Sequence, residues 1–217
     1  IMMKADELGI EPTEFIDEIN KNHQESLAKF GIEYTNYHST HSKENEALVS
    51  EIYLDAKSSG YIYKKEIEQC FDKEKQMFLA DRYVIGECPK CSAKDQYGDG
   101  CEECGATYSA TELINPKSSL SGSKPITKIS EHIFFDLEKA KDDLVNFLDN
   151  SSIQKPILGK LSEWIDGDLK SWDISRDAPY FGFQIPDETK KYFYVWVDAP
   201  IGYMASADNW ANKNSHS

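Results

Sequence analysis

Four cysteines near the middle of the chain restrict its fold more than any other feature of the sequence. Cys88 and Cys91 form one Cys-x2-Cys pair, and Cys101 and Cys104 form a second pair after nine intervening residues. Each pair places two sulfurs on one tight turn. Two such turns that face each other offer four thiolates at the corners of a tetrahedron, which is the coordination shell of a structural zinc ion. Two disulfides are the alternative, but tandem pairs across a short polar loop are more typical of zinc.

A metal site closed by four thiolates has no open coordination position, so we expect one zinc ion with a structural role and no catalytic one. The metal would stabilise a lobe that is too small to fold around an apolar core of its own. The fifth cysteine, Cys70, stands alone in the sequence, and we expect it to be a small buried side chain.

The length and net charge of the chain limit the classes of function that it can have. The chain has 217 residues, enough for one sizeable domain or two small ones, and a formal net charge of −14. This charge argues against strong nucleic-acid binding by the chain alone. No apolar run is long enough to span a membrane, and paired cysteines that act as metal ligands indicate the reducing cytoplasm. The chain opens in mid-pattern at Ile1, so we expect it to be a piece of a longer protein.

The pattern of apolar residues predicts an α/β organisation. Residues 1–60 read as two helices, a strand at 32–37 and a further helix, which suits half of a parallel-sheet unit. Residues 61–136 read as short strands around the cysteine pairs, and residues 137–166 return to helix. We expect the strands at 32–37 and 192–197 to pair in a reduced sheet, with apolar helix faces left partly exposed.

The segment 171–204 is the richest in aromatic side chains, which it combines with a few charged groups. An aromatic wall of this kind suits a small-molecule pocket. An aromatic sheet edge is equally consistent with the composition.

Several segments closely resemble methionyl-tRNA synthetases, a family of class I aminoacyl-tRNA synthetases. They are SWDISRDAPYFGF at 171–183, YFYVWVDAPIGYM at 192–204, NYHSTH at 36–41 and CEECGATYS at 101–109. The resemblance is to the bacterial type with a single four-cysteine zinc site. It implies an enzyme that condenses methionine with ATP and Mg to methionyl-adenylate, and then transfers the methionyl group to tRNA(Met).

The resemblance also implies a domain plan. A catalytic Rossmann fold is interrupted by an inserted, mixed α+β connective domain with the four-cysteine lobe. Residues 1–58 would end the first Rossmann half, residues 59–192 would be the insertion, and residues 193–217 would start the second half. The family's HIGH-type and KMSKS-type motifs do not occur in the sequence. We expect them outside residues 1–217, and we therefore expect the chain to be inactive by itself.

The matching segments supply candidate site residues. Trp196 and Tyr203 can enclose a thioether, because sulfur and aromatic rings attract each other. Ala199 and Pro200 are small and rigid enough to admit the methionine side chain, and Trp172 is a further candidate for the same pocket.

Two further side chains are candidates for the catalytic step. Arg176 is the best cation for a carboxylate or phosphate, with a salt bridge to a neighbouring aspartate as its alternative role. His38 could hydrogen-bond ATP or the adenylate, or it could cap a helix. A different class of function also remains open, in which the chain is a stand-alone zinc-ribbon module that docks to a protein or an RNA.

Overall fold

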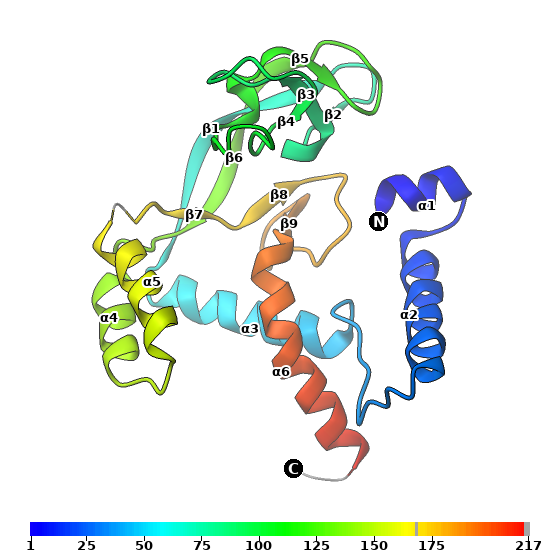
Figure 1. Ribbon diagram of the computed structural model, residues 1–217, viewed down its shortest axis with the longest axis vertical. Helices are drawn as coiled ribbons and strands as arrows, with labels where there is room; N and C mark the ends of the chain where they lie inside the picture. Colours follow the sequence, from blue (N-terminus) through cyan, green and yellow to red (C-terminus); the bar gives the residue numbers. More distant parts are fainter. Residues whose placement is uncertain (168, 215–217) are drawn as a thin grey trace. The chain divides into compact units, whose positions relative to one another are not determined.

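The computed structural model describes residues 1–167 and 169–214 and separates into two compact units (Figure 1). Unit 1 comprises Ile1–Tyr63, Phe135–Ser175 and Tyr180–Ser217, and unit 2 comprises Lys64–Phe134 and Arg176–Pro179. The fold is mixed α/β with antiparallel sheets, as the sequence predicts for its class. Among the described residues, no helix is both long enough and apolar enough to cross a membrane.

Unit 1 contains the α-helices, and local sequence signals mark several of their ends. Gly9 ends the first helix in the left-handed conformation with φ 67°, and Pro12 opens the second at its first turn. Ser42 caps the third, because its Oγ accepts a hydrogen bond from Asn45 N at 3.3 Å. The α-helices of the described residues are α1 (Met2–Leu8), α2 (Pro12–Lys29), α3 (Lys43–Ser58), α4 (Lys141–Asp149), α5 (Lys155–Asp166) and α6 (Val195–Lys213).

Helices α3 and α6 pack against each other and form the centre of unit 1, where Figure 1 shows them crossing. Val49 and Tyr53 of α3 and Ala205 of α6 are buried. The ring of Tyr53 meets the ring of Phe193 edge to face, with centroids 5.5 Å apart. Gly202 allows α6 to approach the segment just before α3 closely, because a Cβ there would lie 2.7 Å from Thr40 Cγ2.

A lysine completes the carboxyl end of α3. Lys139 Nζ donates to the carbonyl oxygens of Ser59 at 3.2 Å and Gly60 at 2.9 Å, and it lies 4.8 Å from the ring centroid of Tyr61. A positive charge at this position is favoured, because the last carbonyls of a helix carry partial negative charge.

Unit 2 is built on antiparallel strands. In one sheet, β1 (Ile62–Asp72) lies between β2 (Met77–Phe78) and β6 (Ile126–Phe135). In the other, β3 (Val84–Glu87) lies between β4 (Gln96–Tyr97) and β5 (Ile114–Ser118). A small core joins them, and it includes Cys70, which is 5% exposed, as predicted; the other members are Leu79, Val84, Ala110 and Leu113. The remaining short strands are β7 (Trp172–Asp173), β8 (Ser175–Asp177) and β9 (Lys191–Phe193).

Two predicted strands are wrong. Residues 32–37 adopt neither helix nor strand, and residues 192–197 divide between the end of β9 and the start of α6. The reduced sheet expected from them therefore does not form. The run Tyr-Phe-Tyr-Val-Trp-Val has high β propensity, but the helical packing of α6 against α3 overrides it. The predicted exposure of apolar helix faces is confirmed for α2, which has no buried residue. For α3 it is wrong at Val49 and Tyr53, which are buried, while Ile52 is 42% exposed.

Candidate metal centre and substrate-binding face

The four cysteines lie on two turns with the same hydrogen-bond pattern. Cys88 N donates to Ala93 O at 2.8 Å, and Cys101 N donates to Ala106 O at 2.9 Å. Within the same turns, the amide four residues after each leading cysteine donates back to the carbonyl of that cysteine at 2.9 Å. This second donor residue is left-handed in both turns, as Ser92 with φ 62° and as Gly105 with φ 71°.

The sulfurs converge as a metal shell requires. All four Sγ atoms lie within 4.8 Å of one another, and the closest cross-turn pairs are Cys91 with Cys101 at 3.6 Å and Cys88 with Cys104 at 3.8 Å. Tetrahedral zinc with Zn–S bonds of about 2.3 Å separates its sulfurs by about 3.8 Å. A disulfide requires about 2.05 Å, and all four thiols are free. The cluster can therefore hold a metal ion of the zinc type.

Backbone amides favour the thiolate form of Cys88, which is one of the two buried cysteines of the cluster. Burial opposes ionisation of Cys88, but the N–H groups of Cys91 and Lys90 and the neighbouring thiols outweigh it and lower the pKa of Cys88 to about 7. Lys90 N lies 3.3 Å from Cys88 Sγ, and Cys104 N lies 3.4 Å from Cys101 Sγ in the second turn. In Cys91 a backbone hydrogen bond from Ala93 lowers the pKa, but the other cysteines and burial outweigh it and raise this pKa to about 12. The fit of the donor set to zinc therefore rests on the convergence of four sulfurs, and zinc binding would release the thiol protons that remain.

The candidates for methionine binding form one face of α6. Trp196, Ala199, Pro200 and Tyr203 follow the spacing i, i+3, i+4 and i+7, which places them on the same side of a helix. This face is open: Trp196 is 62% exposed and Tyr203 is 84% exposed. We call these four residues the α6 aromatic face.

The opposite side of α6 makes the packing contacts. Gly202 approaches Thr40, Ala205 is buried, and Asn209 Nδ2 donates to Glu44 Oε1 at 2.7 Å. Since packing against α3 uses that side, the α6 aromatic face is not required for the core of unit 1.

Glu44 also lies beside His38. The hydrogen bond from Asn209, helped by the Glu44 backbone and by His38, lowers the pKa of the Glu44 carboxyl. His38 Nε2 is 3.5 Å from Glu44 Oε2, and the His38 side chain is 15% exposed. Ser42, and not His38, caps α3, so the helix-capping role considered for His38 is wrong.

The remaining candidates lie on the short strands. Trp172 is half-buried on β7 and belongs to unit 1 with His38 and the α6 aromatic face. Arg176 is half-buried on β8 and belongs to unit 2.

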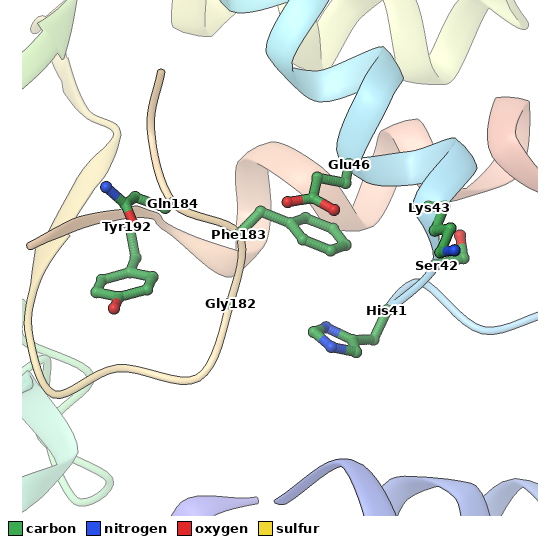
Figure 2. A pocket seen from close by; sticks show the side chains of 8 residues that line it. All are labelled: His41, Ser42, Lys43, Glu46, Gly182, Phe183, Gln184 and Tyr192. Atoms are coloured by element: carbon green, nitrogen blue, oxygen red, sulfur yellow. The ribbon is translucent and has the colours of Figure 1, made fainter. Parts of the chain in front are cut away.

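Unit 1 also contains a pocket that sequence reasoning missed. Its volume is about 370 Å³, and Figure 2 shows that it lies between the start of α3 and the segment that carries Phe183. The imidazole of His41 stacks on the ring of Phe183 with centroids 5.2 Å apart, and it lies 4.6 Å from the ring of Phe181. The wall consists of His41, Ser42, Lys43, Glu46, Gly182, Phe183, Gln184 and Tyr192. One part of this wall follows the histidine-containing segment 36–41, and the other lies in the aromatic segment 171–204. No pattern in the sequence indicates that the two segments lie side by side.

Comparisons with known proteins relate the chain to tRNA synthetases. The family model described as tRNA synthetases class I (M) matches residues 1–217. The chain is similar to a Mycobacterium tuberculosis methionyl-tRNA synthetase in complex with methionyl-adenylate, with a TM-score of 0.64, 15% identity, and coverage of 95% of this chain and 36% of that one. It is also similar to the free-state structure of the Mycobacterium tuberculosis enzyme, with a TM-score of 0.58 and 16% identity. That match covers 91% of this chain and 36% of the other. These likenesses show the fold of a Rossmann-derived synthetase domain with an inserted connective region. The chain spans about a third of the length of those proteins.

Proposed function

The chain belongs to the family of class I tRNA synthetases (M), and from this premise we propose that it is the central part of a methionine–tRNA ligase. The intact enzyme would activate methionine with ATP and Mg to methionyl-adenylate and transfer the methionyl group to tRNA(Met). The domain plan in this proposal assigns 1–58 and 193–217 to the two halves of a Rossmann fold and 59–192 to the connective insertion. The intact enzyme would work in the cytoplasm.

The observation that carries this proposal is the α6 aromatic face. A helix usually buries its largest apolar side chains, yet α6 buries Ala205 and leaves Trp196 and Tyr203 open. Aromatic rings around a thioether contribute about 0.3–1.5 kcal/mol per contact, which suits recognition of methionine. A zinc-ribbon docking module would account for the cysteine turns but would leave this face without a role.

The four cysteine thiolates of unit 2 would hold one zinc ion. Their sulfurs are spaced for a tetrahedral shell with no open position, so the metal would stabilise the turns between β3 and β5 and take no part in the reaction. Each turn has its own hydrogen bonds but contributes little to the apolar core, which supports a folding role for the ion.

In the same proposal, Arg176 stabilises negative charge on the carboxylate or phosphate that reacts, because a guanidinium offers several donors in a fixed plane. His38, with Glu44 beside it, would hydrogen-bond the nucleotide. Trp172 would add a wall to the methionine pocket.

Methionine-dependent exchange of pyrophosphate into ATP tests the proposal. The full-length synthetase that contains this chain should support exchange with methionine and much less with leucine or norvaline. Norvaline lacks the sulfur, and loss of one buried group costs about 1–3 kcal/mol, or about 10- to 200-fold in specificity. The 217-residue chain alone should bind zinc without catalysing exchange. Exchange that prefers another amino acid to methionine would contradict the proposal.

A further inference from the structure

A carboxylate and an imidazole are held together inside unit 2. His132 on β6 is fully buried, and its Nε2 lies 3.0 Å from Asp177 Oδ2. Ser130 Oγ donates to the same carboxylate oxygen at 2.7 Å. Ser130 and His132 are two residues apart on β6, so both side chains leave the same face of the strand and reach one oxygen.

Asp177 is the direct neighbour of Arg176 on β8, a strand of three residues. Successive side chains of a strand point to opposite faces, so Arg176 points away from the face that Asp177 presents to β6. Ser175 shares the face of Asp177 and is fully buried. The backbone that carries Arg176 is therefore fixed by buried contacts on its other face.

From this arrangement we propose that His132 is a positioning residue for Arg176. It holds the Asp177 carboxylate, with the help of Ser130, and so sets the place from which the guanidinium reaches the reacting group. The inference rests on the proposed function, because the role of Arg176 comes from it. His132 itself touches neither methionine nor ATP in this account.

The chemistry of the pair explains why it can position a strand. A carboxylate that is 12% exposed must be compensated by hydrogen bonds, and Asp177 has Ser130 and His132 of β6 among its partners. Loss of the imidazole would remove one of these partners, and the carboxylate would turn toward water or toward other donors. Because β8 is short, such a turn would shift Arg176 as well.

The test measures pyrophosphate exchange by the full-length synthetase, with kcat and the methionine KM as separate readouts. We expect His132→Leu to lower kcat at least about tenfold while the methionine KM changes less than about twofold. His132→Gln should restore most of kcat, because its amide can donate from nearly the same position as Nε2. In an Arg176→Ala background, His132→Leu should cost less than about twofold more, since the two residues act as one unit. Zinc content and melting temperature serve as folding checks.

A matched pair of serine variants keeps the test decisive if His132→Leu does not fold. Ser130→Ala and Ser121→Ala each remove one serine hydrogen bond to a carboxylate in unit 2, at 2.7 Å to Asp177 and 2.6 Å to Asp72. Only Ser130→Ala should lower kcat. Equal kcat values for the two variants, or a full additive loss in the Arg176→Ala background, would overturn the inference. A wild-type enzyme without methionine-dependent exchange would instead overturn the proposed function.

Discussion

The side-chain amide of Asn45 donates to the backbone carbonyl of Asp198 at 3.2 Å, and so ties the first turn of α3 to the first turn of α6. The same Nδ2 donates to Thr40 O at 2.8 Å, and the Asn45 side chain is fully buried. This one amide therefore ties the start of α3 and the segment just before it to α6, 153 positions away in the sequence.

Replacement of Asn45 by alanine should destabilise the protein. Two carbonyl oxygens would lose their donor, and the loss of each of these part-buried hydrogen bonds costs about 0.5–1.5 kcal/mol. Urea unfolding followed by circular dichroism measures the loss. Asn150→Ala, at the exposed end of α4, is the control and should stay within about 0.5 kcal/mol of the wild type. If both variants unfold at the same urea concentration, Asn45 does not tie these segments together.

Gly202→Ala should also destabilise unit 1, although alanine favours helix. The added Cβ would lie 2.7 Å from Thr40 Cγ2, and overpacking of this kind costs about 1–3 kcal/mol. Thr40→Ser removes that methyl group, so the double variant should recover most of the melting temperature. Gly159→Ala in α5 is the control: its Cβ meets open space, and it should raise stability by about 0.5–1 kcal/mol. Lack of recovery in the double variant would show that the contact is not limiting.

The parts of the structure that depend on local chemistry could be predicted from the sequence. The metal cluster follows from the spacing of Cys88, Cys91, Cys101 and Cys104, because each pair closes its own turn. Gly9 and Ser42 mark helix ends through conformation and hydrogen bonding within a few residues.

Features that depend on distant partners could not be predicted. The aromatic run from Tyr192 has strand propensity, but its continuation is a helix that packs on distant residues, with contacts of Gly202 with Thr40 and of Asn209 with Glu44. The pocket beside His41 required rings from residues about 140 positions away, which no local pattern indicates. The contact between His132 and Asp177 is hidden for the same reason.

The carboxylate of Asp72 should make the stability of unit 2 depend on pH in the acid range. Burial raises its pKa, but hydrogen bonds from Ser118, Ser121 and the backbone N–H groups of Lys75 and Glu74 outweigh burial and lower the pKa from 3.8 to about 2. A carboxyl whose pKa is lower in the folded state stabilises the fold above pH 3.8, and this contribution is lost as the pH falls toward about 2.

Asp72→Asn should therefore be less stable than the wild type at pH 7, and the difference should shrink between pH 4 and pH 2. Urea unfolding at several pH values measures this trend. Glu66→Gln, at an exposed position on the same strand, should follow the wild type throughout. A difference between Asp72→Asn and the wild type that stays constant down to pH 2 would refute the role given to the ionised carboxylate.

Cys101→Ser should abolish tight zinc binding, because three thiolates leave the shell incomplete. Elemental analysis should give about one zinc per wild-type chain and little for the variant. Hydrogen exchange should quicken at the amides of residues 88–106, while those of α3 and α6 in unit 1 keep their protection. Cys70→Ala is the control, since Cys70 lies outside the cluster and should keep its zinc. One zinc in Cys101→Ser, or disulfides among the four residues, would contradict the proposed site.

Trp196→Ala and Tyr203→Ala should raise the methionine KM of the full-length synthetase more than they lower kcat. Each removes one ring from the α6 aromatic face, and a contact worth about 0.3–1.5 kcal/mol corresponds to about a 2- to 13-fold change in affinity. Their melting temperatures should stay near that of the wild type, because the two side chains are 62% and 84% exposed. Asp208→Ala, at an exposed position on another side of the same helix, should leave the methionine KM unchanged. Arg176→Ala should show the opposite split, with a lower kcat and a nearly constant methionine KM, since its charge acts on the reacting group. If Trp196→Ala and Tyr203→Ala lower the melting temperature and leave the methionine KM unchanged, these rings serve packing and the α6 aromatic face is not the binding surface.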